Sequence, residues 1–154
     1  MIKMKFSQLV FIGAVNWTHP AWNGGFYPDD LPEDWLLSYY NTQFHAVYLP
    51  QSIWQTVSES TWAEWLNETH AGFIFVLEPG ATECVGPASE RVLLATPTWM
   101  SEHVWWLDDE PDLRALAQGI TRHAVTGEPL FLFSRSGDLA LMEAANTLRQ
   151  VMGY

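Results

Sequence analysis

The chain has 154 residues, enough to bury a hydrophobic core, and its length predicts a single domain over residues 1–154. Its 7 basic side chains stand against 18 acidic ones, which gives a formal net charge of −11. This balance excludes the basic stripe that nucleic-acid binding requires, and it disfavours anionic membranes and phosphorylated ligands. Solubility is the simplest reason for such acidity.

The charges are unevenly distributed along the chain. No Lys or Arg occurs from Phe6 to Glu90, a window that holds ten carboxylates. The single cysteine, Cys84, excludes an internal disulfide and fits a reducing compartment. No apolar stretch reaches the length of a membrane-spanning helix. We therefore expect a cytoplasmic protein without a nucleic-acid or membrane partner.

Apolar runs and helix-start signals alternate along the sequence. Strands are expected at 9–15, 45–49, 72–77, 91–96 and 129–133, and residues 103–107 form a short strand or a lid. Helices are expected from Asp30, acting as a capping residue, to about Thr42, and from Ser58 to about Glu68. Two more begin at Pro111 and at Gly137-Asp138. This alternation predicts an α/β fold with five or six mostly parallel strands.

The stretch after the first strand contains a patterned aromatic motif. Residues 13–28 read Gly-x-x-x-Trp-Thr-x-x-x-Trp-x-Gly-x-Phe-Tyr-Pro, and Tyr39-Tyr40-x-x-x-Phe44 follows. This pattern resembles the opening of the YecE-like family (DUF72), a family of unknown function. The resemblance implies a truncated TIM-like (β/α) barrel in which the central βα units are missing. It implies no reaction.

The chain departs from that family at polar positions. The family's Glu, Asn and Arg around its second strand correspond to Tyr48, Pro50 and Gln55 here. Its Lys after the third strand corresponds to Glu78, and its Asn-Asn pair near the C-terminus corresponds to Ser134-Arg135. Because aromatic residues are kept while polar ones are replaced, the resemblance favours a protein that lacks any reaction performed by the family's polar cluster.

Aromatic residues form the first group of candidate site residues. Trp17, Trp22, Phe26 and Tyr27 could form a ligand platform, because indole faces stack on sugar rings while nearby carboxylates accept hydrogen bonds from hydroxyls. The alternative is an apolar plug packed over the end of the sheet. Trp54 is expected to line the same cleft as Trp17, Trp22 and Tyr27. Arg135 either holds a ligand carboxylate or pairs with Glu78.

Glu78 and His19 are the candidate catalytic residues. Glu78 ends a continuous apolar strand, where barrel enzymes place catalytic groups, and His19 follows the first strand. The alternatives are a solvated rim carboxylate and a solvated loop histidine. The acid run at 108–112 is interpreted as the first turn of the Pro111 helix. The sequence has no metal-binding Cys/His set, phosphate loop or nucleophile elbow, so we expect no metal and no cofactor.

Two functions remain as hypotheses. The first is a non-catalytic binding or interaction domain with an aromatic, acidic cleft at the carboxyl ends of the strands, taking a neutral small molecule. The second is a hydrolase or isomerase acting on a neutral substrate such as a carbohydrate, with Glu78 and His19 as acid and base. A partial barrel leaves sheet edges open, and nine tryptophans suit an interface, so we also expect a homodimer.

Overall fold

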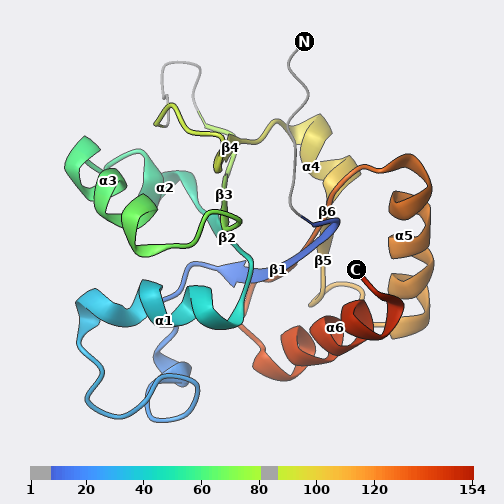
Figure 1. Cartoon of the computed structure of the whole chain (residues 1–154), viewed down its shortest axis with the longest axis horizontal. Coiled ribbons are helices and arrows are strands. Elements are labelled where there is room, and N and C mark those ends of the chain that lie inside the picture. Colours follow the sequence, from blue (N-terminus) through green and yellow to red (C-terminus); the bar gives the residue numbers. More distant parts are fainter. Residues whose placement is uncertain (1–7, 81–86) are drawn as a thin grey trace.

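The computed structural model describes residues 8–80 and 87–154, so Cys84 lies outside the described residues. Six strands form one sheet (Figure 1). They are β1 (Val10–Val15), β2 (Ala46–Leu49), β3 (Ile74–Leu77), β4 (Val92–Leu94), β5 (Val104–Trp106) and β6 (Leu130–Ser134). Every neighbouring pair is parallel. The prediction of an α/β fold with five or six mostly parallel strands is therefore confirmed.

The strand order has the winding of an open barrel. It runs β4-β3-β2-β1-β6-β5, so each strand lies beside its successor in the chain, except at the step from β4 to β5. The last strand returns to the first, with Val10 opposite Leu130 and Ala14 opposite Ser134. A doubly wound sheet would instead reverse its direction at the first strand. Within the described residues, the sheet stays open between β4 and β5.

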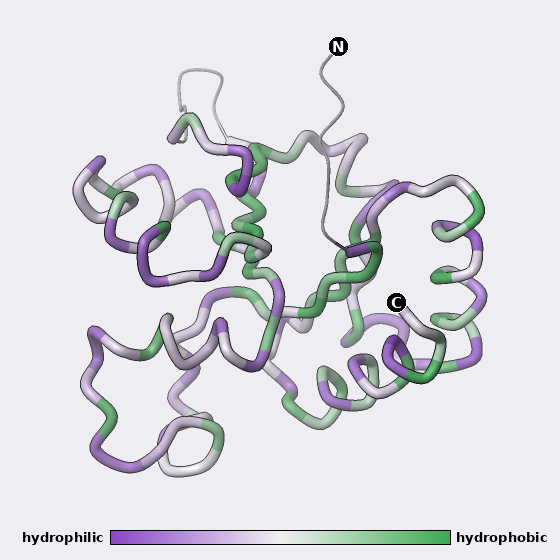
Figure 2. Tube along the Cα trace, viewed as in Figure 1, coloured by the Kyte–Doolittle hydropathy of each residue, from purple (hydrophilic) through white to green (hydrophobic). Residues whose placement is uncertain are grey.

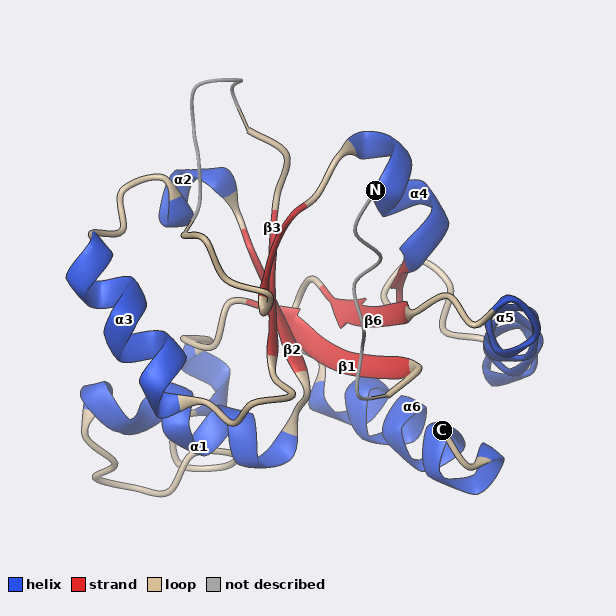
Figure 3. Cartoon of the chain, turned by 45° about the horizontal axis from the view of Figure 1, so that its top comes forward, coloured by secondary structure: helices blue, strands red, loops and turns tan. Residues whose placement is uncertain are grey.

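The helices follow an arc around the outside of this curved sheet, from α3 through α1 and α6 to α5 (Figure 3). The α-helices are α1 (Leu36–Gln43), α2 (Gln51–Trp54), α3 (Glu59–Glu68), α4 (Pro97–His103), α5 (Leu113–Thr126) and α6 (Leu139–Met152). Two 3₁₀ turns, η1 (Pro20–Trp22) and η2 (Glu33–Trp35), precede them. Helix α4 belongs to the connection between the two edge strands, on the open side of the sheet.

Alternating strand residues build two separate cores. Val10 and Ile12 of β1 face the helices and join the larger core with side chains of α1, α3, α5 and α6. Phe11, between them, faces the concave side, where it stacks on Phe131 of β6 with ring centroids 4.7 Å apart. Trp99 of α4 packs over this second core. Figure 2 shows the apolar strands at the centre and the hydrophilic residues on the surrounding loops and helices.

Local signals explain where the helices begin. Ser58 caps α3 by accepting a hydrogen bond from the Thr61 amide, as expected. The expected cap at Asp30 is wrong, because Asp30 has a left-handed φ of 64° and the chain first forms the 3₁₀ turn η2. Helix α4 was not expected, although Thr96 caps it and Pro97 occupies its first turn. Among the described residues, no helix is long and apolar enough to cross a membrane.

Candidate functional site

The aromatic loop after β1 packs against the sheet and α6. Trp22 and Tyr27 are each 1% exposed, and Trp17 is 7% exposed. The indole N–H of Trp22 donates to the Gly137 carbonyl at 2.8 Å, and the Tyr27 hydroxyl donates to the Trp17 carbonyl at 2.5 Å. The indole N–H of Trp22 and the hydroxyl proton of Tyr27 therefore both have acceptors inside the protein. Most of the proposed aromatic platform is therefore packed as a plug, and its ligand-binding role stays a prediction.

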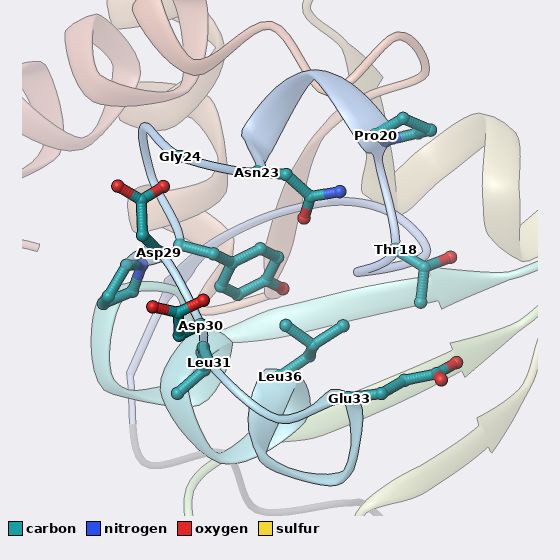
Figure 4. Close-up of a pocket in the computed structure, with 11 residues that line it drawn as sticks. Thr18, Pro20, Asn23, Gly24, Asp29, Asp30, Leu31, Glu33 and Leu36 are labelled. Atoms are coloured by element: carbon teal, nitrogen blue, oxygen red, sulfur yellow. The ribbon is translucent and has the colours of Figure 1, made fainter.

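A first cavity, of about 440 Å³, lies between this loop and the start of α1 (Figure 4). Its lining combines apolar side chains such as Leu31 and Leu36 with three carboxylate residues, Asp29, Asp30 and Glu33. The loop reaches this shape through Gly24, whose φ of 77° suits glycine. Within residues 8–80 and 87–154, no basic residue contributes to the lining.

A second cavity, of about 490 Å³, adjoins the first, since Thr18 and Glu33 line both. Trp17 and Trp65 form an aromatic wall, with their rings at 86° and their centroids 4.8 Å apart. The other lining residues come from η2, α1 and α3 and include four carboxylate residues: Glu33, Asp34, Glu64 and Glu68. Here too, no basic residue from the part of the chain that the structure describes lines the cavity.

One carboxylate of the second cavity, that of Glu68, has a raised proton affinity. Burial raises the pKa of Glu68, and the nearby charges of Glu64 and Asp34 raise it further. The first arginine of the sequence, Arg91, does not relieve this repulsion by pairing with them. Its guanidinium instead donates to the His70 carbonyl at 2.7 Å and to the Thr69 hydroxyl at 2.8 Å. The cavity therefore presents negative charge that a cation could offset.

His19 lies beside the aromatic plug. Its Nε2 is 2.6 Å from the Val15 carbonyl oxygen, and its ring packs on Trp22 with centroids 4.5 Å apart. The ring also touches Gly137, where a Cβ atom would approach it to 2.8 Å. A short hydrogen bond to a backbone carbonyl requires a proton on Nε2. The geometry gives His19 a clear positional role between β1 and the loop before α6.

Glu78 lies at the carboxyl end of β3 and is half-buried. One carboxylate oxygen accepts the Gln51 amide at 2.9 Å, and the other lies 3.4 Å from the Tyr48 hydroxyl. Its own carbonyl accepts the Trp54 indole N–H at 3.1 Å, and Trp54 is buried. Burial and the Glu78 charge raise the pKa of Tyr48. The hydrogen bonds that Glu78 and His19 make among the described residues go to different partners.

Arg135, at the end of β6, makes an ion pair with Asp109 at 2.5 Å and stacks over the Trp106 ring at 4.0 Å. Of the two alternatives for Arg135, the pairing with Glu78 is not found among the described residues, and the binding of a ligand carboxylate stays a prediction. The prediction that the acid run at 108–112 forms the first turn of a helix is wrong, because α5 begins at Leu113 and its first turn has no acidic residue. Asp108 accepts the hydroxyls of Ser134 and Ser136, at 3.0 and 2.7 Å, and ties the end of β5 to the end of β6. Asp112 does cap α5, through the Arg114 amide.

Of the predicted site residues, only Trp17 and Tyr27 line the two cavities described above, and Trp22, Trp54 and Arg135 do not. The carboxylate residues and Trp65 were not singled out. Two features of the sequence point to these carboxylates. One is the window from Phe6 to Glu90 that contains no Lys or Arg, and the other is the four-residue spacing of Glu64 and Glu68, which places both on one face of α3. No group of three or more His, Cys, Asp or Glu residues within 8–80 and 87–154 could hold a metal ion.

Comparison with known proteins gives a family but no activity. Residues 11–80 match the model of a family described as "Protein of unknown function DUF72". The chain is also similar to the crystal structure of a DUF72 family protein from Thermotoga maritima, with 18% identity and a TM-score of 0.41. That alignment covers 96% of this chain and 54% of the other, so the chain spans about half its length. A search of curated proteins found no match.

Proposed function

Because residues 11–80 assign the chain to the DUF72 family, whose description names no function, we propose from its geometry that it is a non-catalytic binding domain. The observation that carries this proposal is the second cavity, in which the Trp17–Trp65 wall lies among four carboxylate residues. An aromatic face with nearby carboxylates suits a small polar molecule that stacks and donates hydrogen bonds. The ligand is neutral, such as a carbohydrate, or carries positive charge.

The lining of the second cavity favours a neutral or cationic ligand and disfavours an anion. An anion would add to the repulsion that already raises the pKa of Glu68. A hydroxyl or ammonium group would instead donate to the carboxylates, and an ammonium would also gain from an indole face. Trp65 is only half-buried, so part of its ring is open to a ligand. The single cysteine and the net charge of −11 fit a cytoplasmic binding protein.

Binding is tested by saturation-transfer NMR and calorimetry with three panels: neutral sugars, organic amines and carboxylates. We expect binding from the first or second panel and none from the carboxylates. Glu64→Gln should weaken binding by about tenfold, as expected for loss of a charged hydrogen-bond acceptor. Glu143→Gln, a matched change at an exposed position of α6, should leave it unchanged. Binding that survives Glu64→Gln combined with Glu68→Gln would contradict the proposal.

The second candidate function is a hydrolase or isomerase that uses Glu78. The observation in its favour is the Tyr48–Glu78 contact, which places a hydroxyl beside a carboxylate at the strand ends where barrel enzymes react. In this version Glu78 accepts the substrate proton and His19 acts as the second acid–base group. Chromogenic glycosides of several configurations test it. Turnover that Glu78→Gln abolishes supports catalysis, whereas turnover that this change leaves intact argues against it.

A homodimer joined through a sheet edge forms part of the same proposal. Edge strand β4 is three residues long, and Leu94 on it is 48% exposed. Unpaired strand edges tend to find partners. Light scattering during gel filtration at two concentrations should give twice the monomer mass, and Leu94→Lys should restore the monomer. A monomeric wild-type chain at both concentrations would remove the dimer from the proposal.

A further inference from the structure

Eight of the nine tryptophans are buried or half-buried, and Trp35 is the exception. Its side chain is 62% exposed. Trp35 ends the 3₁₀ turn η2, and its sequence neighbours on both sides line the cavities: Glu33 and Leu36 the first, Asp34 and Leu37 the second. The Trp35 side chain lines neither cavity, but its backbone lies on the turn whose residues line both. Because tryptophan is highly buried on average, an exposed indole at this place is an uncommon surface feature.

We propose that Trp35 and the two cavities beside it form a docking surface for a basic, extended polypeptide segment of a partner protein. This inference rests on the proposed binding function and names the partner. The apolar part of the surface consists of the exposed indole together with Leu31 and Leu36 of the first cavity. Tryptophan is among the residues that contribute most to protein–protein binding energy, provided that the partner covers it.

Charge complementarity identifies the occupant. Among the described residues, the two linings contain no basic side chain and six carboxylate residues: Asp29, Asp30, Glu33, Asp34, Glu64 and Glu68. No Lys or Arg occurs in the sequence from Phe6 to Glu90, the window that supplies every residue of the two linings, so their charged side chains are all negative. The field of such charges attracts a cationic partner and accelerates its association.

The arrangement favours a polypeptide over a single small cation. A lone amine can fill one cavity, but it leaves Trp35 exposed and the other cavity empty. A chain segment can place one Lys or Arg in each cavity and cover the indole with the residues between them. Arg or Lys also stacks favourably on tryptophan faces. A second copy of this chain is a weaker fit, because each copy carries a net charge of −11.

The experiment is fluorescence anisotropy with a labelled twelve-residue peptide in which Arg alternates with Gly and Leu, and with a matched peptide that carries Glu in place of Arg. The full chain is used at 0.15 M salt or near it, where remote charges are screened. We expect saturable binding of the Arg peptide only. Trp35→Ala changes no charge and should weaken this binding about tenfold or more, as for an interface hot spot. Glu33→Gln should weaken it as well.

The controls separate docking from adsorption to an acidic surface. Glu143→Gln on α6 should leave affinity unchanged, and Trp35→Ala should keep the wild-type melting temperature because the side chain is mostly exposed. Equal binding by wild type and Trp35→Ala would overturn the proposal and leave only non-specific attraction. Binding of the Glu peptide, or self-association that competes with the Arg peptide through the same Trp35 surface, would overturn it too.

The outcome also separates this inference from the proposed function on which it rests. Small-molecule binding that depends on Glu64 without any peptide binding would retain the cavity as a site and reject the docking surface. Peptide binding that depends on Trp35 without any small-molecule binding would retain the docking surface and reject a small-molecule ligand. Failure of both sets of titrations would reject both.

Discussion

The hydroxyl of Tyr40, on α1, donates a 2.7 Å hydrogen bond to the carbonyl oxygen of Ala46 in β2. The same hydroxyl accepts the amide of Ala14 in β1 at 2.8 Å, so a side chain bridges two strands inside the sheet. Gly13 makes room for it, because a Cβ atom there would lie 1.8 Å from the Ala46 carbonyl oxygen and 2.8 Å from the Tyr40 hydroxyl. The glycine and the tyrosine of the sequence motif therefore serve one structural purpose.

Removing the Tyr40 hydroxyl should destabilise the protein without altering its fold. In Tyr40→Phe, the buried Ala14 amide and Ala46 carbonyl lose a shared partner, which costs about 1–3 kcal/mol. Urea unfolding monitored by circular dichroism measures this loss. Tyr39→Phe is the matched control, because its ring contacts with Phe26 and Tyr27 survive the change. Equal stabilities for the two variants would contradict this role.

The parallel strands and most helices could be predicted from sequence because their signals are local. Ser58 caps its helix as expected, and the buried strands read as continuous apolar runs. The start of α1 could not be predicted from Asp30 and Pro32, since the left-handed φ of Asp30 depends on how the loop packs. Helix α4 had a Thr-Pro signal, but Pro97 also fits the end of a strand.

The candidate site was less predictable because it depends on contacts between distant segments. Sequence placed Glu78 at a strand end, but only the fold shows that Gln51 and Tyr48 supply its partners. The acidic cavity joins η2 with the second half of α3, about thirty residues apart. The sequence of acidic residues is the same whether their side chains are spread over the surface or gathered around one cavity. Solubility is therefore the simpler explanation from sequence alone.

Two tryptophan variants should separate the plug from the exposed surface. Trp22→Ala removes a side chain that is 1% exposed together with its hydrogen bond to Gly137, and should cost about 3–5 kcal/mol. Trp35→Ala removes a mostly exposed side chain and should change stability by about 0.5 kcal/mol or less. Thermal and urea unfolding check both values. A Trp22→Ala protein as stable as wild type would favour a ligand platform over a plug.

Asp108 should make the β5–β6 connection sensitive to acid. Burial alone would raise its pKa, but hydrogen bonds from Ser136, Arg135 and Ser134 outweigh burial and lower the pKa below the ordinary 3.8. A lowered carboxyl pKa contributes stability above pH 3.8, and this contribution disappears as the pH falls through the folded-state value. Asp108→Asn should therefore be less stable than wild type at pH 7, and the difference should shrink below pH 3.8.

Unfolding free energies of both proteins across this pH range measure the effect. Asp109→Asn removes only the exposed ion pair with Arg135, and it should change stability by about 1 kcal/mol or less. A constant difference between Asp108→Asn and wild type at every pH would show that the carboxylate charge has no part in the connection.

His45 should give a second acid transition at higher pH. Its Nδ1 accepts the Ile12 amide at 3.2 Å, which requires that nitrogen to be unprotonated. Burial, aided by the charges of Arg149 and His70, lowers the pKa of His45 from 6.5 to about 4. Because the folded-state pKa lies below the unfolded one, its stabilisation is complete above pH 6.5 and is lost as the pH falls toward 4. The shift corresponds to about 3 kcal/mol.

Asparagine at position 45 isolates this contribution, because its side-chain oxygen can accept the Ile12 amide and does not titrate. The stability of His45→Asn should fall less steeply than that of wild type between pH 6.5 and 4, by about 3 kcal/mol over the whole interval. Trp35→Ala removes no titratable group, so it serves as the control and should keep the steep wild-type decline across the same window. If the unfolding free energies of wild type and His45→Asn fell in parallel with pH, protonation of His45 would not destabilise the folded protein.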